Sequence, residues 1–147
     1  MRDLTLKIYR DSTELLAEIE CVLAASRPSF RHSPLQDVIE LLCHGRHATW
    51  VGIYLAAGTT SQQLLGAGRE PHPGQMARPE TKSKILVSMK LAGHEFGVVD
   101  VESDRENAFG PEDRVLLENV ANLLARFLAG PGRYIARSAR TKAMAKA

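Results

Sequence analysis

The chain has 147 residues, of which 44% are hydrophobic and 24% are charged. These proportions and this length indicate one globular domain with one hydrophobic core, and they exclude a fibrous repeat and a disordered chain. No apolar run approaches the roughly 20 residues that cross a bilayer, and the N-terminal residues lack the apolar stretch of a secretory signal. We therefore expect a cytoplasmic protein that has no membrane partner.

The charge is unevenly distributed along the chain. The net charge is +2, yet the segment from Arg133 onward holds five basic residues and no acidic one, which leaves about −3 on the rest. We expect residues 1–132 to form the domain and residues 133–147 to form a basic C-terminal tail. A solvated tail is the favoured interpretation, and binding of nucleic acid by release of counterions is the alternative.

Two helices are predicted in the first third of the chain. Apolar residues recur at helical spacing between residues 12 and 25, which predicts the first helix. Ser33 is a suitable N-cap and Pro34 suits the first helical position. Because the same apolar spacing follows, the second helix is expected to run from there to about Gly45.

Strands follow where the apolar period changes to two. Residues 49–55 alternate and are rich in β-branched and aromatic side chains, which predicts a strand. A turn follows at 57–60, and residues 61–68 are expected to pair back as a second strand. Residues 70–82 contain three prolines, so we expect an irregular connection there.

A second hairpin and a last helix complete the pattern. Residues 85–91 and 96–101 both alternate, and a turn lies between them. Gly110 and Pro111 begin the last helix, and Gly130 ends it. This order predicts an α+β fold with an antiparallel sheet of about four to five strands and helices packed mainly on one face.

The segment from His94 to Ala129 resembles the C-terminal signature of GAF domains. That signature is a strand reading G-V-aliphatic-D/N, a loop ending in F-x-x-E/D-D and a long helix. The matching residues are Gly97, Val98, Asp100, Ser103, Phe109, Glu112 and Asp113. Residues 48–55 also resemble the first sheet strand of the family. The resemblance implies a sensor domain in signal transduction, with a small-molecule ligand, a signalling protein as partner and a homodimer formed through the first and last helices.

The sequence is shorter than the family's usual chain in one place. The family has several short helices and a further strand where this chain has only residues 70–82. The strand with Asp100 and Glu102 is similar to that of GAF-type free methionine sulfoxide reductases, which bind their substrate's amino group with the matching acids. Those enzymes draw a nucleophilic thiolate from the region that is short here. Cys21 and Cys43 lie in the first two helices, where we expect buried, reduced thiols.

Five residues are candidates for ligand binding: Trp50, Tyr54, His94, Asp100 and Glu102. The two acids are two residues apart in a strand, so both can face the side that His94 faces and bind a cationic amine. The alternative is that they only cap and solubilise the end of a strand. Trp50 and Tyr54 share a strand face and could stack on a flat ligand, although packing in the core or at a dimer surface is the favoured interpretation.

We predict a non-enzymatic signalling module without catalytic residues, cofactor or metal. His44 and His47 have the spacing of a metal pair, but the sequence places no third ligand near them. Dimerisation is expected because the last helix has a wide band of apolar residues between Val115 and Leu128, more than one sheet face requires. The alternatives are a truncated relative of the free methionine sulfoxide reductases and a nucleic-acid binder that uses the basic tail.

Overall fold

The computed structural model describes residues 10–25, 33–46, 48–57, 60–68 and 81–137, with the backbone alone for residues 57 and 60–68. The helices and strands occur in the predicted order. They are α1 (Ser12–Ala24), α2 (Pro34–Gly45), β1 (Trp50–Ala57), β2 (Thr60–Gly68), β3 (Ser83–Leu91), β4 (His94–Ser103) and α3 (Pro111–Ala129).

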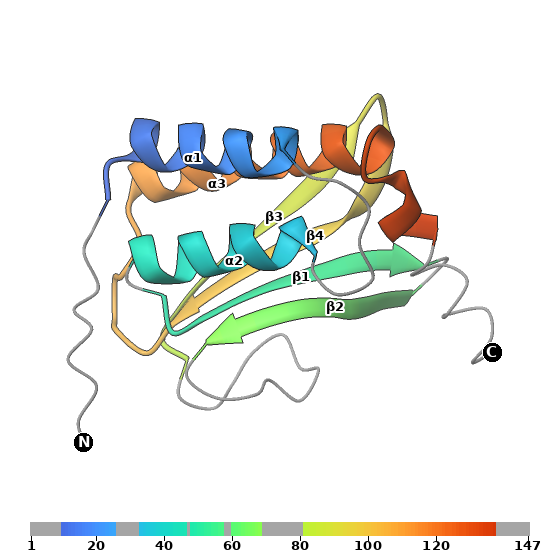
Figure 1. The fold of residues 1–147 in the computed structure, drawn as a ribbon. Helices are drawn as coiled ribbons and strands as arrows, with labels where there is room; N and C mark the ends of the chain where they lie inside the picture. The colour runs from blue at the N-terminus through green and yellow to red at the C-terminus, as the bar shows by residue number, and fades with distance from the viewer. Residues whose placement is uncertain (1–9, 26–32, 47, 58–59, 69–80, 138–147) are drawn as a thin grey trace, which may run out of the picture.

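The strands form one antiparallel sheet in the order β2-β1-β4-β3. The two hairpins are joined through the central pair of β1 with β4. All three helices lie on one face of this sheet (Figure 1). The predicted α+β class and the antiparallel sheet are therefore confirmed, and none of the described helices covers the second face of the sheet.

The register of the central strands separates the two faces. Ile53 pairs with Val99, and Val51 pairs with Val101. These side chains are buried in the core beneath the helices. Because side chains alternate along a strand, the residues between them point to the face opposite the described helices.

The helices begin where local chemistry predicts. Asp11 accepts hydrogen bonds from the backbone N–H groups of Thr13 and Glu14 at the start of α1. The Ser33 hydroxyl accepts one from Leu35 N at the start of α2. At α3, Pro111 occupies the first turn and acidic side chains lie beside the positive end of the helix dipole.

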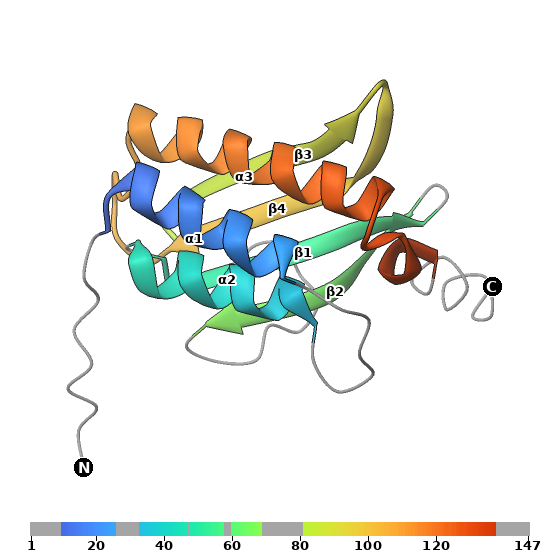
Figure 2. The same cartoon turned by 45° about the horizontal axis from the view of Figure 1, so that its top comes forward.

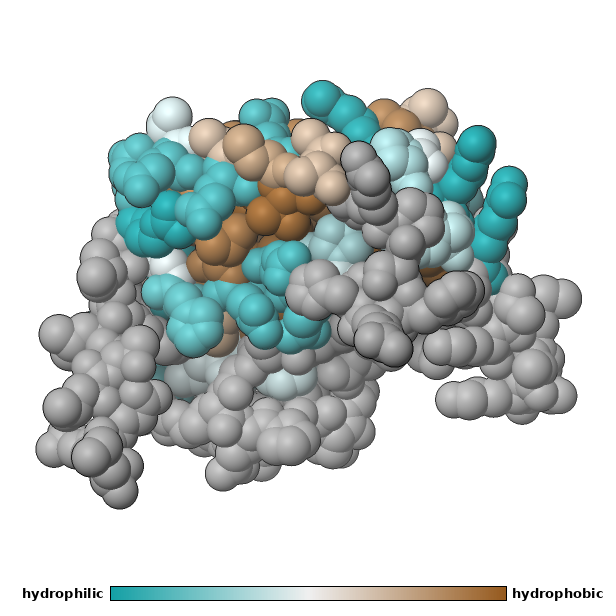
Figure 3. Space-filling model, viewed as in Figure 1, coloured by the Kyte–Doolittle hydropathy of each residue, from teal (hydrophilic) through white to brown (hydrophobic). Residues whose placement is uncertain are grey.

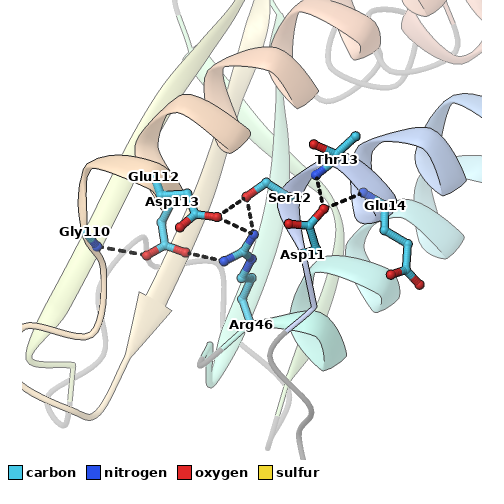
Figure 4. Close-up of polar contacts among 8 residues, drawn as sticks. All are labelled: Asp11, Ser12, Thr13, Glu14, Arg46, Gly110, Glu112 and Asp113. Atoms are coloured by element: carbon cyan, nitrogen blue, oxygen red, sulfur yellow. Dashed lines mark hydrogen bonds and ion pairs between the residues drawn. The ribbon is translucent and has the colours of Figure 1, made fainter.

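A buried arginine joins the ends of the three helices (Figure 4). Arg46 follows α2 and is 4% exposed, and its guanidinium lies 3.2 Å from the Asp113 carboxylate in the first turn of α3. Arg46 also donates to the Ser12 hydroxyl, which donates to Glu112 over 2.9 Å. This network fixes α1, α2 and α3 relative to one another at one end of the helical layer.

The apolar band of α3 is covered within the chain. α1 lies between α2 and α3, and α3 packs on the sheet through β3 and β4 (Figure 2). Of the band, Val115 is 57% exposed and Leu123 is half-buried, whereas the other large apolar side chains are buried. The surplus that led us to expect a dimer is therefore mostly buried between the sheet on one side and α1 on the other.

Two sequence predictions fall partly outside the described residues. Of the predicted connection from Glu70 to Lys82, only Thr81 and Lys82 are described, and both lack regular structure. Of the predicted tail, residues 133–137 form a helical turn, and Ile135 is buried against the core. The first turn of the tail thus packs on the domain.

Candidate ligand-binding site

Two acids and two aromatic residues meet on the face of the sheet opposite the described helices. Asp100 and Glu102 alternate with the core residues of β4, so their side chains leave the opposite side of the strand. Trp50 pairs with Glu102 across the sheet, and Tyr54 lies further along β1 on the same side. We call Trp50, Tyr54, Asp100 and Glu102 the Asp100 cluster.

All four members of the Asp100 cluster are buried. Asp100 and Glu102 are both 0% exposed, Trp50 is 3% exposed and Tyr54 is 2% exposed. An acid that only solubilises the end of a strand is exposed, so that alternative is wrong for both carboxyl groups. Buried carboxyl groups are costly unless they are protonated or paired with a donor or a cation, which makes this cluster a candidate functional site.

Gly52 brings the two aromatic rings together. It lies between Trp50 and Tyr54 on β1 and pairs with Asp100 on β4. A Cβ atom at this position would lie 2.8 Å from Trp50 Nε1 and 3.1 Å from Tyr54 Cε2. The rings therefore occupy the space above this glycine, next to the strand position of Asp100.

The two carboxyl groups differ in their hydrogen bonds. The Thr81 hydroxyl donates to Glu102 Oε1 over 2.7 Å. Among the described residues, neither oxygen of Asp100 accepts a hydrogen bond from an N–H or hydroxyl donor. Its neighbour is the carboxyl group of Glu102, and two carboxyl groups can share a hydrogen bond only when one of them is protonated.

Burial dominates the electrostatics of the cluster. Burial, the hydrogen bond with Glu102 and the negative charge of Glu102 together raise the pKa of Asp100 to about 9, against the opposing effect of the positive charge of Lys84. Burial and the negative charge of Asp100 raise the pKa of Tyr54 to about 12. At neutral pH the cluster therefore contains a protonated carboxyl group and a neutral phenol.

His94 does not join the cluster. It lies at the start of β4 beside the hairpin turn, is exposed, and packs edge-on against Phe96 with ring centroids 4.5 Å apart. It lies six positions before Asp100 on the strand, a span of about 20 Å. A register shift between Met89 and Lys90 also interrupts the regular pairing between them.

The cysteines lie on the helical side of the sheet. Cys43 is buried on α2, as predicted, with its thiol 3.8 Å from the Ala48 carbonyl oxygen. Cys21 is exposed on α1, so the prediction that it is buried is wrong. Its side chain points away from the core that Leu15, Ile19 and Leu23 of the same helix enter. Neither thiol is on the face that carries the Asp100 cluster.

A concave region lies in the helical layer. A groove of about 540 Å³ runs between α1 and α2. Figure 3 shows hydrophobic residues in the middle of this side of the molecule, with hydrophilic residues around them. The groove is lined by Arg10, Glu18, Val22, Asp37, Glu40, Leu41, His44 and Gly45. Its polar residues are those of an ordinary solvated helix surface.

The described part of the chain shows neither a metal-binding group nor a membrane-spanning helix. In the part of the chain that the structure describes, no group of three or more histidine, cysteine and acidic side chains could bind a metal ion. His44 lies at the end of α2, and the structure does not describe its predicted neighbour His47. Within the same part of the chain, no helix combines the length and the apolar character that crossing a membrane requires.

Two contributors to the site were missed in the sequence. Gly52 interrupts an otherwise bulky strand, and this irregularity is a signal that the backbone or a side chain approaches closely there. Thr81 gave no signal, because its contact with Glu102 spans 21 residues and depends on the pairing of β3 with β4.

Structural comparison places the chain among proteins of known fold. The free methionine-R-sulfoxide reductase of Neisseria meningitidis, in complex with its substrate, aligns with a TM-score of 0.69 and 19% identity over 84% of this chain and 91% of that chain. A putative GAF sensor protein from Burkholderia vietnamiensis aligns with a TM-score of 0.66 and 20% identity, over 84% of this chain and 99% of that chain. The GAF domain of a phosphoenolpyruvate-protein phosphotransferase from Coxiella burnetii aligns with a TM-score of 0.67 and 13% identity, over 91% of this chain and 99% of that chain.

These likenesses show that the chain has the GAF fold. At the level of sequence, no protein-family model and no curated protein matches it. The similar structures include sensor domains and reductases alike, so the fold is compatible with both functions.

Proposed function

We propose that this protein is a non-enzymatic regulatory module of the GAF fold that binds a small molecule carrying a protonated amine at the Asp100 cluster. The supporting observation is the pair of carboxyl groups of Asp100 and Glu102 at 0% exposure. An ammonium group supplies the N–H donors and the positive charge that such a pair requires when both groups are ionised.

The rest of the cluster suits the same class of ligand. Trp50 and Tyr54 place aromatic rings on the same face as the acids, and such rings attract cations and stack on apolar groups. The neisserial protein is named for free methionine-R-sulfoxide, an amino acid with an ammonium group. Methionine sulfoxide is therefore the first compound to test, although the chemistry of the cluster requires only the amine.

Isothermal titration calorimetry tests this function directly. The probes are L-methionine sulfoxide, L-methionine and n-butylamine, and N-acetyl-L-methionine sulfoxide is the control that lacks the ammonium group. We expect at least one free amine to bind, and its affinity to fall by about tenfold or more in Asp100→Asn and in Glu102→Gln, because one ionic partner is lost. Glu95→Gln, at an exposed position of the same strand, is the control variant. Equal binding by Asp100→Asn and the wild type would refute the proposal.

A thiol-dependent reductase is the second candidate. The structural likeness to reductases favours it, whereas the positions of Cys21 and Cys43 on helices across the sheet from the acids favour binding without catalysis. The test is reduction of free methionine sulfoxide with a thiol reductant by the wild type and by the Cys21→Ser, Cys43→Ser double variant. We expect no activity in either. Activity that the double variant loses would establish the enzyme.

Signalling through association is the proposed output of the module. In each protomer, α1 and α3 present their outer surfaces, and Val115 is an exposed large apolar side chain on α3. We expect Val115→Glu to shift a dimer toward monomer in light scattering at micromolar concentration, while Leu86→Glu, an exposed position on β3, leaves it unchanged. A wild-type protein that is only monomeric would contradict association.

A further inference from the structure

We infer that the Asp100 cluster exchanges a proton for its ligand: the empty site contains one proton shared between the carboxyl groups of Asp100 and Glu102, and this proton is released when an ammonium group binds. This inference rests on the proposed function and adds to it how the site responds to pH. It begins with the geometry of β4. Residues two apart on one strand face have Cα atoms about 7 Å apart, so their carboxyl groups can meet.

The described neighbours leave Asp100 without a donor. Thr81 donates its hydroxyl hydrogen to Glu102, and neither Asp100 oxygen accepts a hydrogen bond from an N–H or hydroxyl group in the described part of the chain. A proton on one carboxyl group converts it into a donor toward the other. One shared proton therefore provides the hydrogen bond that two carboxylates cannot make with each other.

The charged and titratable groups around the pair favour keeping that proton. On β1, Tyr54 is neutral over the relevant range and Trp50 has no charge. On β3, Lys84 pairs with Glu102 and is exposed, and it is the positive group that acts on Asp100. The helices lie across the sheet. Among the described side chains, Lys84 is thus the one positive group that faces the two carboxyl groups. When one carboxyl group holds a proton, the single remaining negative charge is balanced by Lys84.

Ligand binding reverses this arrangement. With both carboxyl groups ionised, the ligand's ammonium donates N–H groups to them and its charge replaces that of the proton. The exchange is balanced: protonated site plus R–NH₃⁺ gives ionised site with bound R–NH₃⁺ plus one H⁺ in solution. Because burial raises the pKa of Asp100 to about 9, the proton is present throughout the neutral range. Affinity for an amine should therefore rise by about tenfold per pH unit until that pKa is reached.

Calorimetry in buffers of different ionisation enthalpy measures the exchange. The probe is L-methionine sulfoxide or n-butylamine, whichever binds more tightly, titrated at pH 7.5 in phosphate and in Tris. The slope of the observed enthalpy against the buffer enthalpy should correspond to release of about one proton per ligand. Binding without proton release would overturn the inference and leave the proposed function intact. Absence of binding by every amine would overturn both.

A second measurement needs no ligand. Carbon-13 NMR of the side-chain carboxyl groups follows the protonation of Asp100 in the free protein. We expect a carboxyl titration near pH 9 that is missing in Asp100→Asn and unchanged in Glu95→Gln. Titration of all carboxyl groups below pH 6 would overturn the inference, because the empty site would then contain no proton to release.

Discussion

The two faces of the sheet differ in whether their buried groups have partners of matching chemistry. On the helical face, Val51, Ile53, Val99 and Val101 contact other apolar side chains, and the buried Arg46 is paired with Asp113. On the other face, Asp100 is equally buried but accepts no hydrogen bond from a described N–H or hydroxyl donor. This difference indicates that the helical face stabilises the fold, and under the proposed function the Asp100 cluster sacrifices stability for binding. Changes on the helical face should therefore lower stability and leave amine affinity unchanged.

The largest loss of stability is expected from a substitution in β4, whose side chains point to both faces of the sheet. Gly97 has φ +149°, and a Cβ there would lie 1.9 Å from the carbonyl oxygen of Tyr54. We expect Gly97→Ala to lower the unfolding free energy by about 4 kcal/mol or more, because backbone atoms must move. Gly93 has φ +81° with open space around it, so Gly93→Ala should cost only about 1 kcal/mol. Equal losses in urea denaturation would contradict this account.

Arg46→Ala tests the buried ion pair of Arg46 with Asp113 on the helical face. It leaves Asp113 buried without its cation, and removal of one partner from a buried pair costs about 3 kcal/mol. The exposed pair of Arg114 with Glu118 provides the control, since Arg114→Ala should change stability by less than about 0.5 kcal/mol. A similar effect of the two variants in thermal denaturation would show that the network in Figure 4 contributes little.

Truncation tests where the stabilising region ends. Ile135 is buried against the core, so a chain ending at residue 132 should lose about 1–2 kcal/mol of unfolding free energy. A chain ending at residue 137 keeps that contact and should match the full chain. If both truncations are equally stable in urea, the turn at 133–137 is not part of the folded domain.

The sequence predicted the elements well because their signals are local. Asp11, Ser33 and Pro111 determine where helices begin from within a few residues, and the strands show their own alternation. The two acids were correctly assigned to one strand face for the same reason. Their complete burial could not be predicted, because it depends on parts of the chain that are distant in sequence.

Other sequence predictions depend on tertiary packing. The sheet and α1 cover most of the apolar band of α3, and the dimer expected from that band stays a prediction that now depends on the exposed surface around Val115. His94 was grouped with the acids by its even spacing, but it lies at the far end of the strand beside the turn. Cys21 is exposed because its position in α1 falls outside the stripe of Leu15, Ile19 and Leu23.

The most direct test of the central claim is the stability and the amine affinity of Asp100→Asn as a function of pH. Folding raises the pKa of Asp100 from its ordinary value of 3.8 to about 9. Between these values the folded state retains a proton that the unfolded state has lost. The stability of the wild type therefore falls as the pH rises from about 4 to 9. Asparagine keeps the shape, cannot ionise and can donate to Glu102. We predict that at pH 9 Asp100→Asn is more stable than the wild type by about 1–3 kcal/mol and binds the amine about tenfold or more weakly. A variant that is less stable across this range and binds normally would contradict the account.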